Sequence, residues 1–342
     1  MSEPMRIVYL LEGTSLFGGV KVVLRQANLL AARGHECTVV SREPRPDWMA
    51  LEARFRQVAD LVPAQLPEAD VVVATFWTTI GAARRAPARE AVHYCQGLEY
   101  TYTHNGAEHA AIRAAYRNEL PALCVAPHLA EHLRREYGRP ARVVPQPLEA
   151  FMRPLGRLRP HRRPRILVTG PFEIDWKGVA TALEAVHLLR QDGFDCRLVR
   201  LSQWPLTEAE KEQALPEEYH CHLQPSAVAA LIQSCDLLLA PSWEQEGFGL
   251  PVLEAFACGL PVVASDVSCF RSFARGAATL VPADSPQAFA HAAREALTRT
   301  DHWRRMRHAG LLRAEDYTEQ KAAAAAEAAL SWVAEGAWRA ER

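Results

Sequence analysis

The stretch PSWEQEGFGLPVLEAFACGLPVVASD, residues 241–266, decides the fold, and it follows the apolar segment DLLLA at 236–240. An apolar run typical of a buried strand leads into a loop with two glycines, and a second apolar segment runs from Pro251 to Gly259. Proline is favoured in the first turn of a helix and glycine just after its end, so we expect a helix between these two residues. Strand, tight loop and helix in this order form the repeating unit of a parallel α/β sheet.

The start of this helix is expected to bind an anion. It presents the backbone N–H groups of Phe248, Gly249 and Leu250, with the positive end of the helix dipole behind them. Gly247 and Gly249 allow a tight turn and a close approach of the backbone to a phosphate or a sugar, which a Cβ atom would obstruct.

Two glutamates, Glu246 and Glu254, flank the same loop, one before the glycines and one in the first turns of the helix. A carboxylate can accept hydrogen bonds from both hydroxyls of a vicinal diol, which is a common way to hold a sugar or a ribose. A diol, a phosphate and a second diol in that order describe a nucleotide sugar. The alternative is an acid at the helix start and a solvated helix carboxylate, with no ligand.

Short apolar segments rich in Val, Ile and Leu recur through the whole chain, separated by stretches with helical period. The expected strands of the first half are 6–13, 36–41, 70–76, 91–96, 123–127 and 141–147, and those of the second half are 165–171, 196–202, 220–224, 236–243, 261–267 and 278–283. The clearest helix of the first half is expected at 20–33, with Gly34 as its C-terminal cap.

The fold class expected from this pattern is α/β, with two Rossmann-like lobes whose parallel sheets face a central cleft. The pattern stops in a basic, proline-bearing stretch and then restarts, which marks a domain boundary. We expect an N-terminal acceptor-binding lobe at 1–150, a linker at 151–164, a C-terminal donor-binding lobe at 165–317, and a helix at 318–342 that packs back toward the N-terminal lobe.

Composition narrows the function classes. With 39 basic and 40 acidic residues the formal net charge is −1, so no overall field would attract nucleic acid or an anionic membrane. Residues 153–165 break this balance with six arginines and no acid. They are interpreted as a solvated linker or, alternatively, as a patch for anionic lipid. No secretory signal and no apolar run of membrane-spanning length is visible, so a cytoplasmic protein with at most weak peripheral membrane contact is expected.

The segment 241–266 resembles the signature of retaining glycosyltransferases of family 4, which have the GT-B architecture of two Rossmann-like lobes. Members of this family carry a pair of glutamates separated by seven residues. The resemblance implies that Glu254 binds the ribose of the nucleotide and that Glu246 binds the donor sugar. It extends over nearly the whole chain.

In the second lobe, TGPFEIDWKGV at 169–179 is similar to the strand and loop where family members place an arginine and a lysine on the pyrophosphate. Lys177 matches the lysine, and with Glu246 it forms the catalytic pair that the resemblance implies. Pro171 stands where the arginine is usual, so a second cation would have to come from elsewhere. Arg200 and Lys21 are the two candidates.

In the first lobe, residues 17–35 are similar to the family's first loop and helix, where Gly18 and Gly19 would approach the donor phosphates or the acceptor. Gln96 takes the place of a cleft histidine found in many members. Gln96, Glu99 and His104 are therefore the candidate acceptor residues. Together with residues 201–211 this region looks like a branch that includes rhamnosyltransferases, which implies a thymidine-diphosphate deoxysugar as donor.

The function expected is transfer of a sugar from a nucleotide-diphosphate sugar to a glycan, lipid-linked or small-molecule acceptor, of the kind used in bacterial surface polysaccharide synthesis. No cofactor, metal site or nucleic-acid partner is expected, and the chain contains no DxD sequence. Two alternatives stay open. One is a nucleotide-sugar 2-epimerase of the same architecture, and the other is a non-catalytic sugar-binding partner of a transferase.

Overall fold

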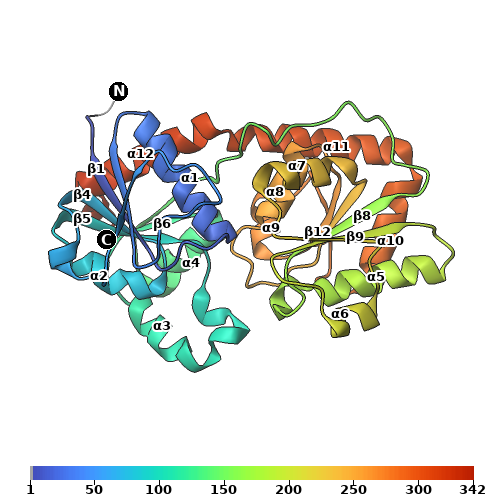
Figure 1. Ribbon diagram of the computed structural model, residues 1–342, viewed down its shortest axis with the longest axis horizontal. Helices are drawn as coiled ribbons and strands as arrows, with labels where there is room; N and C mark the ends of the chain where they lie inside the picture. Colours follow the sequence, from blue (N-terminus) through green and yellow to red (C-terminus); the bar gives the residue numbers. More distant parts are fainter. Residues whose placement is uncertain (1–2) are drawn as a thin grey trace. The chain divides into compact units, whose positions relative to one another are not determined.

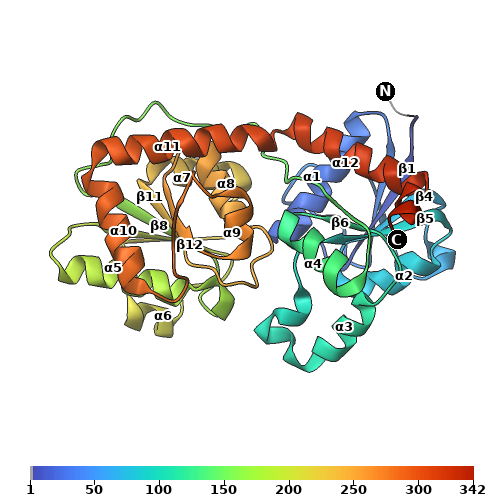
Figure 2. The same cartoon turned by 180° about the vertical axis from the view of Figure 1, so that it is seen from behind.

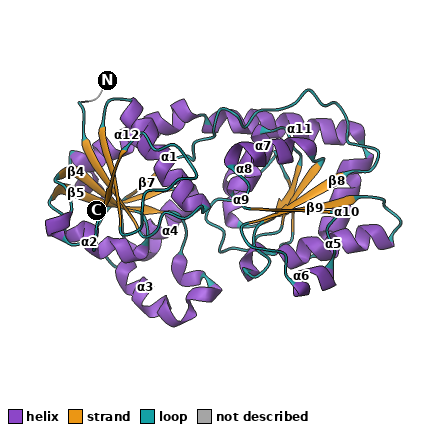
Figure 3. Ribbon diagram, in the orientation of Figure 1, coloured by secondary structure: helices purple, strands orange, loops and turns teal. Residues whose placement is uncertain are grey.

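A computed structural model of the protein describes residues 3–342, which form two compact units (Figure 1). The first unit contains the chain up to Pro147 together with Tyr317–Arg342, and the second contains Leu148–Asp316. Both units are α/β structures built around a parallel sheet (Figure 3). Among the helices of the described residues, none combines the length and the apolar character needed to cross a bilayer.

The first unit has a seven-stranded sheet in which every neighbouring pair is parallel. In spatial order the strands are β3 (Arg54–Gln57), β2 (Glu36–Ser41), β1 (Arg6–Leu11), β4 (Ala69–Ala74), β5 (Ala88–Cys95), β6 (Ala122–Cys124) and β7 (Ala141–Val143). The helices are α1 (Gly18–Ala32), α2 (Ile80–Arg85), α3 (His109–Tyr116), α4 (Pro127–Tyr137) and α12 (Glu319–Ala334). The order of strands reverses between β1 and β4, which is the position where ligands of such sheets bind.

Most of these elements follow from local sequence. The helix expected at 20–33 is α1, and Gly34 follows it with φ +98°, the left-handed conformation that favours glycine after a helix. One strand, β3, was not expected. Its sequence RFRQ is polar and largely exposed, because an edge strand pairs on one side only and needs no continuous apolar run.

The second unit has a six-stranded parallel sheet with the strand order of a Rossmann fold. In spatial order the strands are β10 (Glu218–Cys221), β9 (Arg197–Ser202), β8 (Arg165–Thr169), β11 (Leu237–Ala240), β12 (Val262–Ser265) and β13 (Thr279–Val281). The helices are α5 (Val179–Gln191), α6 (Glu208–Gln213), α7 (Pro225–Ser234), α8 (Leu250–Ala257), α9 (Ser268–Phe273), α10 (Pro286–Thr298) and α11 (Thr300–Ala314). The reversal lies between β8 and β11, the two strands that precede the predicted site loops.

The segment 151–164 is held against the second unit by ion pairs, although most of its residues stay exposed to solvent. Arg157 Nη1 lies 2.5 Å from Asp236 Oδ1, and the backbone N–H of His161 donates to the same oxygen at 3.0 Å. Arg163 pairs with Asp195. Because Asp236 is completely buried, its carboxylate requires such charged partners. Figures 1 and 2 both show the segment running beside α11.

The C-terminal helix α12 belongs to the first unit, where it packs against α1. Ion pairs with Glu327 join Arg33 to the helix, and Arg339 pairs with Glu90 at 2.8 Å just after it. Trp338, just after this helix, is buried with 7% of its surface exposed.

Arg200 on β9 lies in the interior of the second unit. Its Nε lies 2.5 Å from Glu210 Oε1, and its two terminal nitrogens donate to the carbonyls of Val168 and Gly170 at 2.7 and 2.8 Å. The side chains of Arg200 and Glu210 are 0% and 1% exposed. Arg200 was a candidate for the second pyrophosphate cation, and that hypothesis is wrong because all three nitrogens are already used inside the protein.

We predict that Glu210→Gln lowers the free energy of unfolding by about 3 kcal/mol, because it leaves the Arg200 charge buried without its counter-ion. Chemical denaturation of the variant and of the wild type measures the difference. A surface control is Glu208→Gln, whose partner Lys211 is 38% exposed and which should change stability by less than about 1 kcal/mol. Equal effects of the two substitutions would contradict the role assigned to the buried pair.

Candidate functional site

The loop after β8 carries Lys177 at the entrance to α5. A single 3-10 turn spans Asp175–Lys177, and Gly178 then caps α5 with φ +64°. A Cβ atom on Gly178 would lie 2.1 Å from the carbonyl oxygen of Pro241. Only glycine therefore fits at this position, both for its conformation and for the close approach of the two backbones.

The loop after β11 is joined to the loop after β8 by two hydrogen bonds, and a third, within the loop after β11, supports the same carboxylate. The backbone N–H of Trp243 donates to the carbonyl of Trp176 at 2.8 Å. Lys177 Nζ donates to Glu246 Oε2 at 2.7 Å, and Ser242 Oγ donates to the same oxygen at 3.0 Å. The two residues predicted to be catalytic thus form an ion pair at the point where the strand order reverses.

This ion pair is unequally exposed. The side chain of Glu246 is 9% exposed and that of Lys177 is 26% exposed, so the carboxylate is held inside while the ammonium reaches the surface. The ammonium also lies 4.3 Å from the ring centre of Trp176, a favourable cation–π distance. An ammonium has three donors. One of these donors bonds to Glu246, and the exposed side of the ammonium is free of steric obstacles to the approach of an anion only as far as its partial exposure allows.

The start of α8 is rigid. Gly249 caps the helix with φ +85°, and a Cβ atom there would lie 2.4 Å from the ring of Phe270. Phe248 is 5% exposed and stacks on Phe273 with ring centres 4.5 Å apart. Its side chain therefore serves the core, and only its backbone remains for a ligand. Gly249 was expected to allow the close approach of a ligand. The structure shows a second reason for a glycine, which is the close packing of Phe270.

The remaining predicted donor-binding residues lie in the loop after β11 and in α8. Gly247 is buried, Leu250 is the first residue of α8, and Glu254 lies in its second turn with 9% of its surface exposed. A cavity of about 440 Å³ opens beside the loops after β8 and β11, lined by Phe172, Trp243 and the first turn of α5, and Lys177, Glu246 and Glu254 do not line it.

Three residues that support this site were not singled out from the sequence, namely Trp176, Gly178 and Ser242. Gly178 carried a signal, since it stands directly before a stretch with helical period. Ser242 and Trp176 carried none. Each lies close in sequence to the residue it contacts, Glu246 or Lys177, and these two meet only because the fold joins loops that are 69 residues apart in the chain.

In the first unit the structure brings together Gly18, Gly19 and Gln96. Helix α1 begins at Gly18, after β1, and a Cβ atom on Gly19 would lie 3.1 Å from Gln96 Oε1 at the end of β5. The N-terminus of a fifteen-residue helix and a side-chain amide thus meet at one edge of the sheet.

The other two predicted acceptor residues are Glu99 and His104. Glu99 is 4% exposed and accepts a hydrogen bond from the hydroxyl of Tyr116, so its carboxylate does not face a ligand in this structure. Its backbone carbonyl accepts a hydrogen bond from Asn105 at 3.0 Å, which holds the following loop. His104 is exposed on that loop, with its ring centre 5.6 Å from that of Tyr102.

Most of the second unit matches a known protein family. Residues 163–299 match the family described as glycosyl transferases group 1. The chain is 35% identical over 156 residues to a GDP-mannose-dependent alpha-(1-6)-phosphatidylinositol dimannoside mannosyltransferase of Mycobacterium tuberculosis, which covers 45% of this chain and 40% of that protein. It is 29% identical over 135 residues to a phosphatidyl-myo-inositol mannosyltransferase of the same species, with 37% and 35% covered. The chain therefore matches less than half the length of either relative.

Solved structures share the fold over almost the whole chain. Sucrose-phosphate synthase from Thermosynechococcus elongatus is 17% identical with a TM-score of 0.78, and the match covers 95% of this chain and 98% of that one. HepE from Anabaena, solved with UDP-glucose, is 13% identical with a TM-score of 0.73 and coverages of 96% and 100%. These neighbours are GT-B glycosyltransferases, and the expected α/β fold with two parallel sheets is confirmed.

Glu99 should make stability depend on pH. Burial raises the pKa of Glu99 to about 7 from 4.5, although the hydrogen bond from Tyr116 opposes the rise. The folded state then binds the proton more tightly than the unfolded chain does. The resulting stability is fully present below about pH 4.5 and is lost as the pH rises through about 7.

We therefore predict that Glu99→Gln, which stays neutral, becomes more stable than the wild type as the pH rises, by up to about 3 kcal/mol above pH 7. Unfolding free energies measured between about pH 4.5 and 8 check this. The two proteins should be nearly equal at the acidic end, and parallel curves over the whole range would contradict a neutral Glu99.

Proposed function

We propose that this protein is a retaining glycosyltransferase that moves a hexosyl group from a nucleoside-diphosphate sugar to an acceptor. The observation that carries the proposal is the Lys177–Glu246 ion pair, placed where the strand order reverses in the unit that matches glycosyl transferases group 1. That position is where parallel α/β sheets bind nucleotides.

In the proposed donor complex, the pyrophosphate lies between Lys177 and the backbone at the start of α8. The exposed ammonium turns toward the phosphate, which is a stronger acceptor than a carboxylate already bonded to Ser242. Glu246 then accepts hydrogen bonds from hydroxyls of the donor sugar, and Glu254 holds the ribose. Gly18 and Gly19 would approach the phosphates or the acceptor from the first unit.

The chemistry proposed is charge stabilisation of a leaving group. As the bond from the sugar to the nucleoside diphosphate breaks, negative charge grows on the diphosphate while the sugar becomes oxocarbenium-like. Lys177 and the N–H groups of α8 stabilise that charge. With Arg200 excluded, Lys21 on α1 is the remaining candidate for a second cation in place of the arginine that Pro171 replaces. We assign no nucleophile and no general base.

The similar mycobacterial proteins suggest which substrates to test first. We propose GDP-mannose as the first donor and a lipid-linked glycan as the first acceptor, because these relatives are mannosyltransferases named for phosphatidylinositol acceptors. The thymidine-diphosphate deoxysugar expected from Gln96 and residues 201–211 gains no support from them. The 2-epimerase and the non-catalytic partner are likewise not favoured, since both relatives are transferases. A cytoplasmic location with peripheral membrane contact stays part of the proposal.

Purified protein should consume a nucleoside-diphosphate hexose without an added metal ion, because no DxD sequence is present and Lys177 supplies a cation. Release of nucleoside diphosphate from a panel that includes GDP-mannose and a thymidine-diphosphate deoxysugar, with and without EDTA, is the measurement. Loss of turnover in EDTA with recovery in magnesium would overturn the metal-independent chemistry. No turnover and no binding of any panel member would overturn the transferase proposal itself.

The two glutamates should differ in kinetics. If Glu254 holds the ribose, its contacts are equal in the ground and transition states, so Glu254→Gln should mainly raise the donor KM. Glu246 would touch the sugar whose charge changes, so Glu246→Gln should lower kcat by about 10²-fold or more, as expected for one charged hydrogen bond of about 3 kcal/mol.

Binding of the nucleoside diphosphate alone is the control for this pair. It should weaken in Glu254→Gln and stay near the wild-type value in Glu246→Gln, because the diphosphate carries a ribose but no donor sugar. The reverse pattern would show that the roles are exchanged. Wild-type kinetics in both variants would remove the glutamates from the site.

A further inference from the structure

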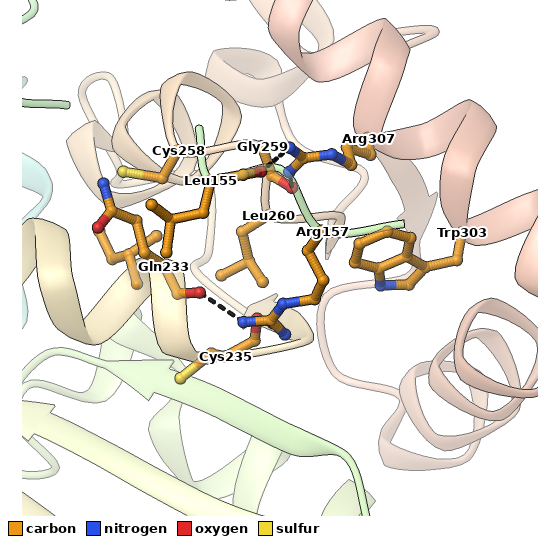
Figure 4. A pocket seen from close by; sticks show the side chains of 10 residues that line it. Leu155, Arg157, Gln233, Cys235, Cys258, Gly259, Leu260, Trp303 and Arg307 are labelled. Carbon is orange, nitrogen blue, oxygen red and sulfur yellow. Dashed lines mark hydrogen bonds between the residues drawn. The ribbon is translucent and has the colours of Figure 1, made fainter. Parts of the chain in front are cut away.

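The second unit carries an arginine-rich surface with exposed leucines that the donor site does not use. It is formed by residues 151–163 and by the outward face of α11, and we call it the linker surface. Two hydrogen bonds from arginine side chains join α11 to the segment. Arg304 Nε donates to the backbone carbonyl of Leu158 at 2.7 Å, and Arg307 donates to that of Leu155. Arg307 Nη1 also donates to the carbonyl of Gly259 at 2.6 Å, which fixes α11 against α8 (Figure 4).

Charge on this surface is strongly one-sided. Residues 151–163 contain five arginines and no acid, and residues 300–314 contain four arginines and one aspartate, in a chain whose net charge is −1. Part of this charge is used internally, because Arg157 pairs with Asp236 and Arg163 with Asp195. These pairs fix the backbone of the segment, so the arginines between them are presented on a rigid base.

Other arginines of the surface face solvent. Arg159, Arg162 and Arg305 are exposed, and within residues 3–342 no ion pair or side-chain hydrogen bond engages them. An uncompensated cluster of guanidinium groups produces a local positive potential that attracts an anionic partner over about a Debye length.

Large apolar side chains are exposed among these charges. Leu155 and Leu158 are 52% and 69% exposed, and Leu312 on α11 is 52% exposed. On α11 the residues Arg305 and Leu312 lie on one face, because they are seven positions apart, opposite the face that buries Trp303. Exposed leucines beside arginines are the combination that inserts into the headgroup region of a membrane while the guanidinium groups contact anionic lipids.

We infer that the linker surface docks the second unit onto an anionic membrane. Arg159, Arg162 and Arg305 contact lipid phosphates, and Leu155, Leu158 and Leu312 enter the acyl boundary. Nucleic acid fits less well, because aliphatic leucines offer no stacking platform for bases. The inference rests on the peripheral membrane contact of the proposed function and assigns that contact to one surface. Donor turnover tests the transferase separately, since no residue of the linker surface belongs to the proposed donor site.

The test is co-sedimentation of the full chain with vesicles of phosphatidylcholine alone or of phosphatidylcholine with phosphatidylglycerol. The wild type should bind only the anionic vesicles, and added salt should release it. Arg159→Gln with Arg162→Gln should lower the partition coefficient about 25-fold, at about fivefold for each basic residue. Leu158→Ser with Leu312→Ser should lower it about tenfold.

Matched controls come from exposed residues elsewhere on the same unit. Leu215, which is 63% exposed, controls for the leucines as Leu215→Ser, and the exposed Arg197 and Arg275 control for the arginines as Arg197→Gln with Arg275→Gln. These controls should keep wild-type partitioning, and thermal unfolding should show every variant folded. Equal binding to neutral vesicles, equal losses in controls and variants, or binding of RNA or duplex DNA without binding of vesicles would each overturn the proposal.

Discussion

The close approach of two backbones at Gly178 is the constraint on which the site depends. The carbonyl of Pro241, at the end of β11, occupies the space where any other residue at 178 would place its Cβ atom. This contact and the Trp243-to-Trp176 hydrogen bond hold the loops after β8 and β11 together. Lys177 and Glu246 are adjacent because their backbones are fixed first. The side-chain ion pair then needs only the two side chains to be ordered, because the backbones that carry them are already held together.

The ion pair also solves an electrostatic problem that exists before any ligand binds. Glu246, which is proposed to hold hydroxyls of the donor sugar, is a buried carboxylate, and a buried carboxylate without partners is costly. Ser242 and Lys177 supply those partners from two different loops. Lys177 is the more exposed member of the pair, so in the proposed complex its ammonium can turn from Glu246 to the phosphate. Glu246 then keeps the hydrogen bond from Ser242.

The sequence predicted the elements well where burial dictates an apolar pattern. The strands on both sides of each reversal point are apolar and buried, and α8 begins at Leu250 and ends before Gly259, close to its expected limits. Prediction failed where the partner of a polar residue is remote in sequence. The polar strand β3 gains its partner only in the folded sheet.

The same limit explains the errors on charged residues. A run of arginines at 153–165 predicts solvent exposure, which holds for most of the run. Arg157 instead pairs with the buried Asp236, an acid that was not identifiable from the sequence. Glu99 was a candidate acceptor residue, whereas the hydroxyl of Tyr116, 17 residues further along the chain, accounts for its carboxylate. The donor motif at 241–266 could be identified from the sequence, because its glutamates, glycines and helix are contiguous in the chain.

Arg200 and Lys177 show why depth, and not charge alone, decides which cation can meet a phosphate. Arg200 lies within β9, where Glu210 and the carbonyls of Val168 and Gly170 satisfy its guanidinium group. Lys177 stands on a loop beyond the end of its strand and reaches the surface. Within the second unit, one lysine and the dipole of α8 must balance the pyrophosphate of the proposed complex. A carboxylate next to that phosphate would then be unfavourable unless it keeps a neutral donor of its own, and the hydroxyl of Ser242 fills this role.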